Sequence, residues 1–424
     1  MKKILVILSV VAVFNADFAE GKKKIYSGKS SSKKTAILSA KKKARKSSSK
    51  KTAILSAKKK VGLPDAKQAV LIDFDTGKIL YDKNSQERCS PSSMTKLMTL
   101  YILFSAIKSG RLAMDDELLV SEEAQSMEGS RSFFKAGTYA KLEDLIRSII
   151  VHSGNDACVI VAEALSGDSS IFADEMNRKA EEFELKNTHF TNPTGLPDEE
   201  HYSTAYDLAI IAQRLIKDFP EYYSYFSEKT FTINGITQPN RNTLLGNSMG
   251  VDGLKTGHTN AGGYGLIAST TRNDKRLIAV VNGCSGTKSR NLAANGLLAL
   301  GYREFANFRT IKAGTPITKL KVWLGDRNEI DVCAHEDINI MIPRKLQNRF
   351  KVEAKMKEPI EAPVALGSKV GELSYRYENF VSKKYDLFAC QEVKRAGFFE
   401  RARSAVSYLL FGTSDSQQGL KTQQ

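Results

Sequence analysis

Apolar residues between positions 62 and 308 follow two different periods. In "AVLIDFDTGKILYDKN" (69–84) two apolar stretches flank Asp75-Thr76-Gly77, a pattern that predicts a β-hairpin. "YGLIASTTRNDKRLIAVVNG" (264–283) predicts a second hairpin, with its turn at Asn273-Asp274. Hairpins pair antiparallel strands, so we expect an antiparallel sheet in this region.

Longer segments of the same region have helical spacing. One of them, "SSMTKLMTLYILFSAIKSG", is almost wholly apolar, so it predicts a buried helix that Gly110 ends. A second segment is interrupted around Ser153-Gly154-Asn155 and predicts two helices, and a third begins at Thr204, a favoured N-cap. The helical ranges are 92–110, 142–167, 204–219 and 290–305. Sheet and helices together predict an α+β domain over residues 62–308.

The pattern changes after residue 308. Short apolar runs at regular spacing, such as "TKLKVWLG" and "FKVEAKM", predict a small all-β domain over residues 309–395. Residues 396–424 predict an amphipathic helix and a tail: Phe398, Val406 and Leu409 share one face, opposite arginines. This helix is too short to span a bilayer, so it either lies on a membrane surface or packs on the β domain.

The N-terminal region carries the charge of the chain. Residues 1–19 have two lysines before a short apolar run, which predicts a signal peptide and export. Residues 20–61 contain "SSSKKTAILSAKKK" twice and predict a disordered basic linker, a spacer or a polyanion-binding arm. The chain has a formal net charge of +16, but residues 1–60 hold 18 basic and 2 acidic side chains. The rest is neutral, so the charge does not indicate a nucleic-acid-binding surface.

Cysteine and histidine are sparse. The 5 cysteines are far apart and odd in number, so we expect buried free thiols and no complete disulfide framework. The 5 histidines show no spacing typical of a zinc site, and we expect neither a metal nor a cofactor.

Three short motifs carry the candidate chemistry. Ser93 and Lys96 lie three residues apart at the start of the buried helix, so they share one face. Burial lowers the pKa of a lysine, which suits Lys96 to accept the serine proton. Ser153 and Asn155 follow in "HSGNDAC", and "DGLKTGHT" contains Lys255, Thr256 and Gly257.

In this order the motifs resemble the S-x-x-K, S-x-N and K-T-G set of penicillin-recognising serine enzymes. Together with the β domain and the amphipathic end, the chain resembles the low-molecular-mass penicillin-binding proteins that are D-alanyl-D-alanine carboxypeptidases. The resemblance covers about residues 62–411 and implies a β-lactamase/transpeptidase-like catalytic domain. It also implies a periplasmic enzyme attached to the outer face of the cytoplasmic membrane, with peptidoglycan pentapeptides as substrates and β-lactams as covalent inhibitors.

The resemblance assigns roles to individual residues. Ser93 becomes the nucleophile and Lys96 the general base, while Ser153 relays a proton and Asn155 holds the substrate amide or Lys96. Lys255, Thr256 and Arg241 are candidates for binding the terminal carboxylate. The main-chain N–H groups of Ser93 and His258 are candidates for the oxyanion hole.

Three alternatives remain open at this point. A class A-like β-lactamase would need a deacylating glutamate, for which Glu184 in "ELKN" is the candidate. An α/β-hydrolase would use Ser248 in "GNSMG". A non-catalytic cell-wall-binding protein would have the motifs without the activity.

Overall fold

The computed structural model describes residues 66–307, 311–338, 341–349, 351–377, 380–381 and 384–399. The signal peptide, the basic linker and residues 400–424 of the amphipathic end lie outside the described residues. Those three predictions therefore stay predictions.

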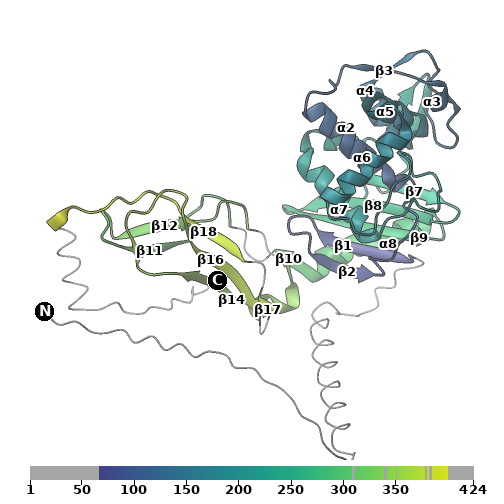
Figure 1. Ribbon diagram of the computed structural model, residues 1–424. Coiled ribbons are helices and arrows are strands. Elements are labelled where there is room, and N and C mark those ends of the chain that lie inside the picture. Colours follow the sequence, from purple (N-terminus) through teal and green to yellow (C-terminus); the bar gives the residue numbers. More distant parts are fainter. Residues whose placement is uncertain are drawn as a thin grey trace, which may run out of the picture. The chain divides into compact units, whose positions relative to one another are not determined.

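A five-stranded antiparallel sheet forms the centre of the first domain (Figure 1), with the strand order β2-β1-β9-β8-β7. Its strands are β1 (Gln68–Asp73), β2 (Ile79–Lys83), β7 (Val251–Thr259), β8 (Gly263–Arg272) and β9 (Lys275–Cys284). Both predicted hairpins are confirmed, as β1–β2 and β8–β9. Because β1 pairs with β9, the two ends of this domain meet in one sheet.

Each strand of this sheet contributes to two hydrophobic cores. Successive side chains of a strand point to opposite faces, so Val70 and Ile72 enter one core, and Ala69 and Leu71 the other. The first core is shared with the helices α2, α5 and α7, and the second with α8. The domain is therefore a sheet between two helical layers, one thick and one made by α8 (Figure 1).

The predicted helices are present with small shifts at their ends. The helix at 142–167 is interrupted at Ser153-Gly154 as expected, directly after a π-helical turn named η2. Thr204 caps α7 by accepting a hydrogen bond from the Asp207 N–H. The helical elements are η1 (Ser92–Thr95), α2 (Lys96–Lys108), α3 (Glu122–Ser126), α4 (Leu142–Arg147), η2 (Ser148–His152), α5 (Asn155–Ser166), α6 (Ser169–Glu182), α7 (Ala205–Asp218), η3 (Pro220–Ser227) and α8 (Thr287–Glu304).

Two short ribbons lie outside the central sheet. They pair β3 (Glu117–Leu119) with β4 (Tyr139–Lys141), and β5 (Thr230–Ile233) with β6 (Ile236–Pro239). Strands of three or four residues are too short for a clear alternation, so the sequence did not predict them.

The second domain is a β-sheet with a core of its own. Its strand order is β14-β16-β18-β12-β11-β15, with β17 beside β16, while β10 pairs with β13. The strands are β10 (Phe305–Asn307), β11 (Thr318–Trp323), β12 (Glu329–Cys333), β13 (Met341–Pro343), β14 (Lys351–Met356), β15 (Ile360–Glu361), β16 (Lys369–Tyr377), β17 (Phe380–Val381) and β18 (Tyr385–Ala389); a short turn, η4 (Arg344–Arg349), follows β13. The observed architecture is thus an α+β domain followed by an all-β domain.

The expectation of free thiols is wrong for two of the five cysteines. Cys333, the last residue of β12, forms a disulfide with Cys390, which directly follows β18. The pairing of β12 with β18 brings the two residues together, a proximity that their separation of 57 residues does not reveal. Cys89, Cys158 and Cys284 are free thiols.

Candidate active site

Ser93 lies in the 3₁₀ turn η1, which leads directly into α2. The turn leaves Ser93 half-buried while the helix that follows enters the core, so Lys96 is completely buried. Lys96 Nζ lies 3.0 Å from Ser93 Oγ, as the three-residue spacing predicted.

Three oxygen atoms surround the Lys96 amine. Besides Ser93 Oγ, they are Asn155 Oδ1 at 2.8 Å and the main-chain carbonyl of Thr194 at 2.6 Å. The carbonyl oxygens of Asn155 and Thr194 only accept hydrogen bonds, so they take two of the N–H groups of Lys96. The third position faces Ser93. It holds an N–H when Lys96 is charged and a lone pair when Lys96 is neutral.

Burial lowers the pKa of Lys96 below its ordinary value of 10.5, because the charged form loses its hydration. The neighbours Cys158 and Asp156 act in the opposite direction and raise this pKa, but burial is the larger effect. The neutral amine, which can accept the Ser93 proton, is therefore more accessible here than in an exposed lysine.

The turn that presents Ser153 is irregular. It follows the π-helical turn η2, and Ser153 has a left-handed backbone with φ of 69°. π-helical turns are rare, and a left-handed backbone is uncommon in residues other than glycine. Both features occur often at functional sites. Asn155 begins α5 two residues later, and its Nδ2 donates to the Glu128 carbonyl at 2.6 Å, which turns Oδ1 toward Lys96.

Lys255 lies on the edge strand β7 and is also buried, with 1% of its side chain exposed. Its Nζ donates to Ser153 Oγ at 2.9 Å and to the Thr256 carbonyl at 3.2 Å. Burial, and then the positive charge of Lys96, lower the pKa of Lys255 well below 10.5. The two lysines thus disfavour each other's charge in one small site.

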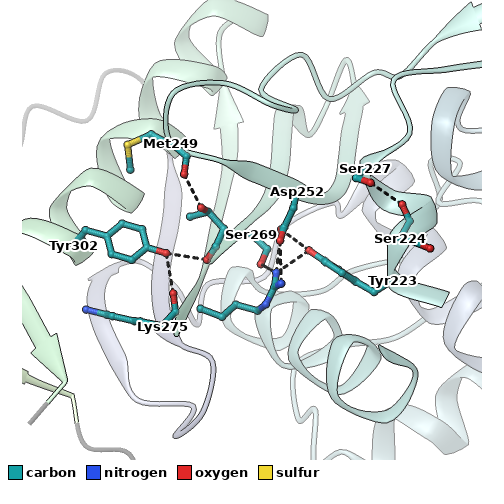
Figure 2. Close-up of polar contacts among 10 residues, drawn as sticks. Tyr223, Ser224, Ser227, Met249, Asp252, Ser269, Lys275 and Tyr302 are labelled. Carbon is teal, nitrogen blue, oxygen red and sulfur yellow. Dashed lines mark hydrogen bonds and ion pairs between the residues drawn. The ribbon is translucent and has the colours of Figure 1, made fainter. Parts of the chain in front are cut away.

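A half-buried polar cluster of Tyr223, Asp252 and Arg276 holds the start of β7 (Figure 2). Tyr223 Oη donates to Asp252 Oδ1 at 2.7 Å, and Arg276 binds the same carboxylate with both terminal nitrogens at 2.9 Å. Gly253 fits beside this cluster only without a side chain, since a Cβ would lie 2.7 Å from Tyr223 Oη. The cluster fixes β7 three residues before Lys255.

The other residues of the third motif lie on the same strand. Thr256 is buried, with 7% exposed, and the ring of His258 is exposed and lies against Tyr264. A Cβ on Gly257 would lie 2.8 Å from the Pro91 carbonyl, so this glycine allows β7 to pass close to the Ser93 turn.

Arg241 is less closely joined to the site. Its main-chain N–H donates to the Val151 carbonyl in η2, but its exposed guanidinium bonds to Gln238 at 3.4 Å. The positive charge of Arg241 nevertheless helps to lower the pKa of Lys255. The structure thus joins Ser93, Lys96 and Asn155 by hydrogen bonds, and Lys255 to Ser153. The charge of Lys96 acts on Lys255, while the Arg241 side chain lies at the rim.

Sequence reasoning missed several residues that shape the site. The Thr194 carbonyl is one, and Arg290 is another: it is buried and donates to the Arg241 carbonyl at 3.4 Å. The charge of Arg290 also lowers the pKa of Lys255. A buried arginine on the largely polar start of α8 has no signature in the sequence.

Comparisons with known proteins decide the family. A family model described as D-alanyl-D-alanine carboxypeptidase matches residues 55–286, and one described as penicillin-binding protein 5, C-terminal domain, matches residues 305–395. The D-alanyl-D-alanine carboxypeptidase DacA of Haemophilus influenzae is 39% identical over 340 residues, which covers 79% of this chain and 86% of that protein. The chain belongs to the D-alanyl-D-alanine carboxypeptidase family.

Further relatives agree with this membership. DacF of Bacillus subtilis is 38% identical over 344 residues, covering 79% of this chain and 87% of that protein. The crystal structure of penicillin binding protein 5 from Haemophilus influenzae matches with a TM-score of 0.71 at 38% identity, covering 78% of this chain and 98% of that chain. The predicted fold class and the predicted enzyme class, a serine-type D-Ala-D-Ala carboxypeptidase, are confirmed.

The alternative sites do not have the geometry that they need. Ser248 is exposed in a turn before β7, and no helix follows it, whereas a nucleophile elbow leads from a strand into a helix. Glu184 is exposed just after α6, and it is the later segment around Thr194 that contacts Lys96. Within the described residues, no group of three or more His, Cys, Asp or Glu side chains is arranged to hold a metal.

Proposed function

We propose that this carboxypeptidase uses Ser93 as its nucleophile and Lys96 as the general base. The observation that carries the proposal is the contact set of Lys96: two carbonyl acceptors and, in the third position, Ser93 Oγ at 3.0 Å. A neutral Lys96 that donates two hydrogen bonds to the carbonyls keeps its lone pair on the serine hydroxyl. This arrangement activates a serine that would otherwise be a weak nucleophile.

In the acylation step the Ser93 hydroxyl proton moves to Lys96. Ser93 Oγ bonds to the carbonyl carbon of the penultimate D-alanine, and the negative charge develops on the carbonyl oxygen. The main-chain N–H groups of Ser93 and His258 receive this charge in an oxyanion hole. The C–N bond to the terminal D-alanine then breaks, and the leaving amine takes up a proton.

Ser153 is the proposed relay for that proton. Its hydroxyl accepts a hydrogen bond from Lys255 and so has its own proton free to donate toward the leaving amine. Lys96 then reprotonates Ser153. Water later attacks the ester carbon, loses a proton to the same basic groups, and releases the shortened peptide with Ser93 restored.

Recognition of the terminal carboxylate falls to the basic groups beside β7. Lys255, the Thr256 hydroxyl and the exposed guanidinium of Arg241 are the proposed contacts. A bound carboxylate places a negative charge beside the buried Lys255 and so offsets the cost of burying its ammonium group. Specificity for a free C-terminus follows from this local excess of positive charge.

The test uses the purified protein and a peptide ending in D-Ala-D-Ala. We expect release of one D-alanine per peptide, measured with a D-amino acid oxidase assay, and covalent labelling by a fluorescent penicillin that maps to Ser93. Labelling without D-alanine release would instead support a non-catalytic penicillin-binding protein. Labelling at another serine would refute the assignment of Ser93.

We further propose that the enzyme is exported to the periplasm. The apolar run in residues 1–19 supports export, and so does the Cys333–Cys390 disulfide, since such bonds persist mainly in oxidising compartments. Detection of the mature protein in a periplasmic extract, with its N-terminus near residue 20, tests this proposal. A full-length protein found only inside the cytoplasm would contradict it.

The last part of the proposal is attachment to the membrane surface through residues 396–424. Within the described residues, no helix is long and apolar enough to cross a bilayer. Phe398 and Phe399 are 72% and 86% exposed, and burying such rings in the membrane interface is favourable at about 25 cal/mol per Å². These exposed rings and the arginines that follow suit an anionic lipid surface.

Liposome flotation tests the attachment. A protein beginning at Gly62, and therefore without the basic linker, should float with anionic liposomes, and removal of residues 397–424 should abolish flotation. High salt should weaken this binding less than binding through the linker, because exposed charges are screened. If the protein with the C-terminal segment stays in the soluble fraction, the segment has a structural role instead.

A further inference from the structure

The segment after α6 lies directly against the turn that carries Ser93. Gly195 shows how close the two are: a Cβ there would lie 2.0 Å from the Ser92 carbonyl oxygen, and its φ is +79°. Two side chains of α2 bind consecutive carbonyls of this segment, Thr99 that of Pro193 and Lys96 that of Thr194, both at 2.6 Å. One of the two carbonyls that orient Lys96 thus belongs to a loop.

Asn192 sets the direction of the Thr194 carbonyl. Its Oδ1 accepts hydrogen bonds from the main-chain N–H groups of Thr194, Gly195 and Leu196 at 3.1, 2.8 and 3.2 Å. It also accepts from the Thr194 hydroxyl at 2.8 Å. A single side-chain oxygen therefore closes the turn 192–196, which we call the Asn192 turn.

His201 joins Thr191, the residue before the Asn192 turn, to the S-x-x-K motif itself. Its Nδ1 accepts from the Thr191 main-chain N–H at 3.1 Å, and its Nε2 lies 2.8 Å from Thr95 Oγ1. Since Nδ1 is an acceptor, the ring hydrogen is on Nε2, and His201 donates to Thr95. Thr95 directly precedes Lys96 in this motif. His201 is 4% exposed, and burial lowers its pKa to about 4, so the ring is neutral at physiological pH.

We propose that His201 is a positioning residue for acylation. It holds Thr191, and with it the start of the Asn192 turn, against Thr95, so that the Thr194 carbonyl stays on Lys96. The proposal rests on the proposed function, with Ser93 as nucleophile and Lys96 as base. The role concerns the orientation of Lys96. A neutral amine has two N–H groups, and both must bond to Asn155 and Thr194 for the lone pair to face Ser93. If the Thr194 carbonyl withdraws, the amine can rotate and water can reach it.

This role predicts an effect on pH dependence as well as on rate. The titratable and charged groups that act on Lys96 are Asp156, Cys158 and Lys255, together with His201, which carries no charge above about pH 4. Removing His201 leaves the other three in place but admits water beside Lys96. The pKa of Lys96 then rises toward its ordinary value, and the acid limb of the acylation rate moves to higher pH.

The experiment compares His201→Ala, His201→Gln and Asn192→Ala in the full chain. The rate constant of acylation by a fluorescent penicillin is measured from pH 5 to pH 10, alongside kcat and KM for D-alanine release and the unfolding temperature. We expect His201→Ala to lower the acylation rate at pH 7 by about 10- to 100-fold, since a small misplacement of a catalytic group has costs of that order. The acid limb should move to higher pH by a measurable fraction of a unit or more.

The other variants separate positioning from general stability. His201→Gln keeps an N–H donor and an acceptor. It should restore most of the acylation rate and return the acid limb to its original pH. Asn192→Ala should shift the limb in the same direction as His201→Ala, although His201 is intact. His189→Ala is the control: this half-buried histidine bonds to the Glu200 carbonyl and should leave rate and profile unchanged.

Two outcomes would overturn the proposal. The first is a His201→Ala protein that acylates at the original rate with the original pH profile. The second is a loss of rate that is equal at every pH, not rescued by glutamine and accompanied by a lower unfolding temperature, since this is what a structural role alone produces. Failure of the proposed function looks different, because the unmodified protein would then not be acylated on Ser93 at all.

Discussion

Lys255 Nζ lies 2.9 Å from Ser153 Oγ, although the two residues are 102 positions apart in the chain. One comes from the edge of the sheet and the other from a strained turn in the helical layer, so this contact closes the site between the two. The site contains two buried lysines, and burial lowers the pKa of both. Such an arrangement is costly for stability and useful for a base that must be neutral near pH 7.

Replacement of Ser93 by alanine should remove both acylation and turnover. Without Oγ no ester can form, so we expect at least about a 10³-fold loss of D-alanine release and no penicillin label. Ser248→Ala is the matched control, because Ser248 is an exposed serine outside the site. Normal labelling of the Ser93→Ala protein would show that another residue is the nucleophile.

Replacement of Lys255 tests the recognition of the carboxylate. Lys255→Ala should reduce kcat/KM for a peptide ending in free D-Ala-D-Ala much more than for its C-terminal amide, because only the acid has the charge that Lys255 attracts. We expect a difference of about 10-fold or more between the two substrates. Arg241→Ala should show a smaller difference, since its guanidinium lies at the rim and bonds to Gln238. Equal losses on both peptides would assign Lys255 another role.

The sequence was a good guide to the motif residues. Ser93 and Lys96 share a face because of their spacing, and the apolar run after them indicated that the lysine loses part of its hydration; it is in fact fully buried. What it did not reveal are contacts made by the main chain. The Thr194 carbonyl on Lys96 is a property of the turn that Asn192 closes, and any residue type has such a carbonyl.

The fold was predicted where an element is a long apolar run or has a clear period. β1, α2 and the hairpin strands β8 and β9 are largely buried, whereas α7 buries one apolar face. The pairing of β1 with β9, which completes the sheet, and that of β12 with β18, which forms the disulfide, are long-range and have no local signature. A cysteine count alone therefore gave the wrong expectation for Cys333 and Cys390.

The acyl-enzyme formed with a β-lactam should be long-lived. A rapid deacylation like that of a class A β-lactamase requires a glutamate placed to activate water, and Glu184 is exposed after α6. We expect the penicillin label to persist for minutes or longer. Its lifetime is measured by gel fluorescence after excess antibiotic is removed. Glu184→Gln should leave this lifetime unchanged. Rapid turnover of a chromogenic cephalosporin that is lost in Glu184→Gln would show a β-lactamase mechanism.

Protonation of His152 should contribute to acid unfolding. This buried ring bonds to Ser132 Oγ at 2.8 Å, and burial lowers its pKa from 6.5 to about 4. Between these values the unfolded chain binds the proton and the folded chain does not, so the free energy of unfolding falls as the pH drops from 6.5 to 4, by at most about 1.4 kcal/mol per pH unit. Asp73 opposes this trend, because burial raises its pKa to about 6 and the folded form keeps its proton longer.

A comparison of variants isolates the histidine from these other groups. His152→Gln removes the titration, so the difference in unfolding temperature between the unmodified protein and this variant should shrink as the pH falls from 7 to 4.5. His258→Gln, a change at an exposed ring, should give a difference that is small at every pH. If the difference in unfolding temperature for His152→Gln does not depend on pH, the ring takes up its proton equally in the folded and unfolded states.

The disulfide should stabilise the β domain without affecting the active site. It closes a loop of 57 residues, and loss of this constraint on the unfolded chain costs about 4 kcal/mol in the chain-entropy model. The double variant Cys333→Ser/Cys390→Ser should lower the unfolding temperature of the β domain, measured by calorimetry. A reductant should lower it in the same way in the unmodified protein. Labelling of Ser93 by penicillin should persist in both cases. The cysteines of the catalytic domain, Cys89, Cys158 and Cys284, are free thiols, so a reductant breaks no bond there. Cys89→Ser serves as the control for loss of a thiol.

Two outcomes would rule out the bond. One is titration of five free thiols in protein exported under oxidising conditions, and the other is an unfolding transition that does not respond to reductant.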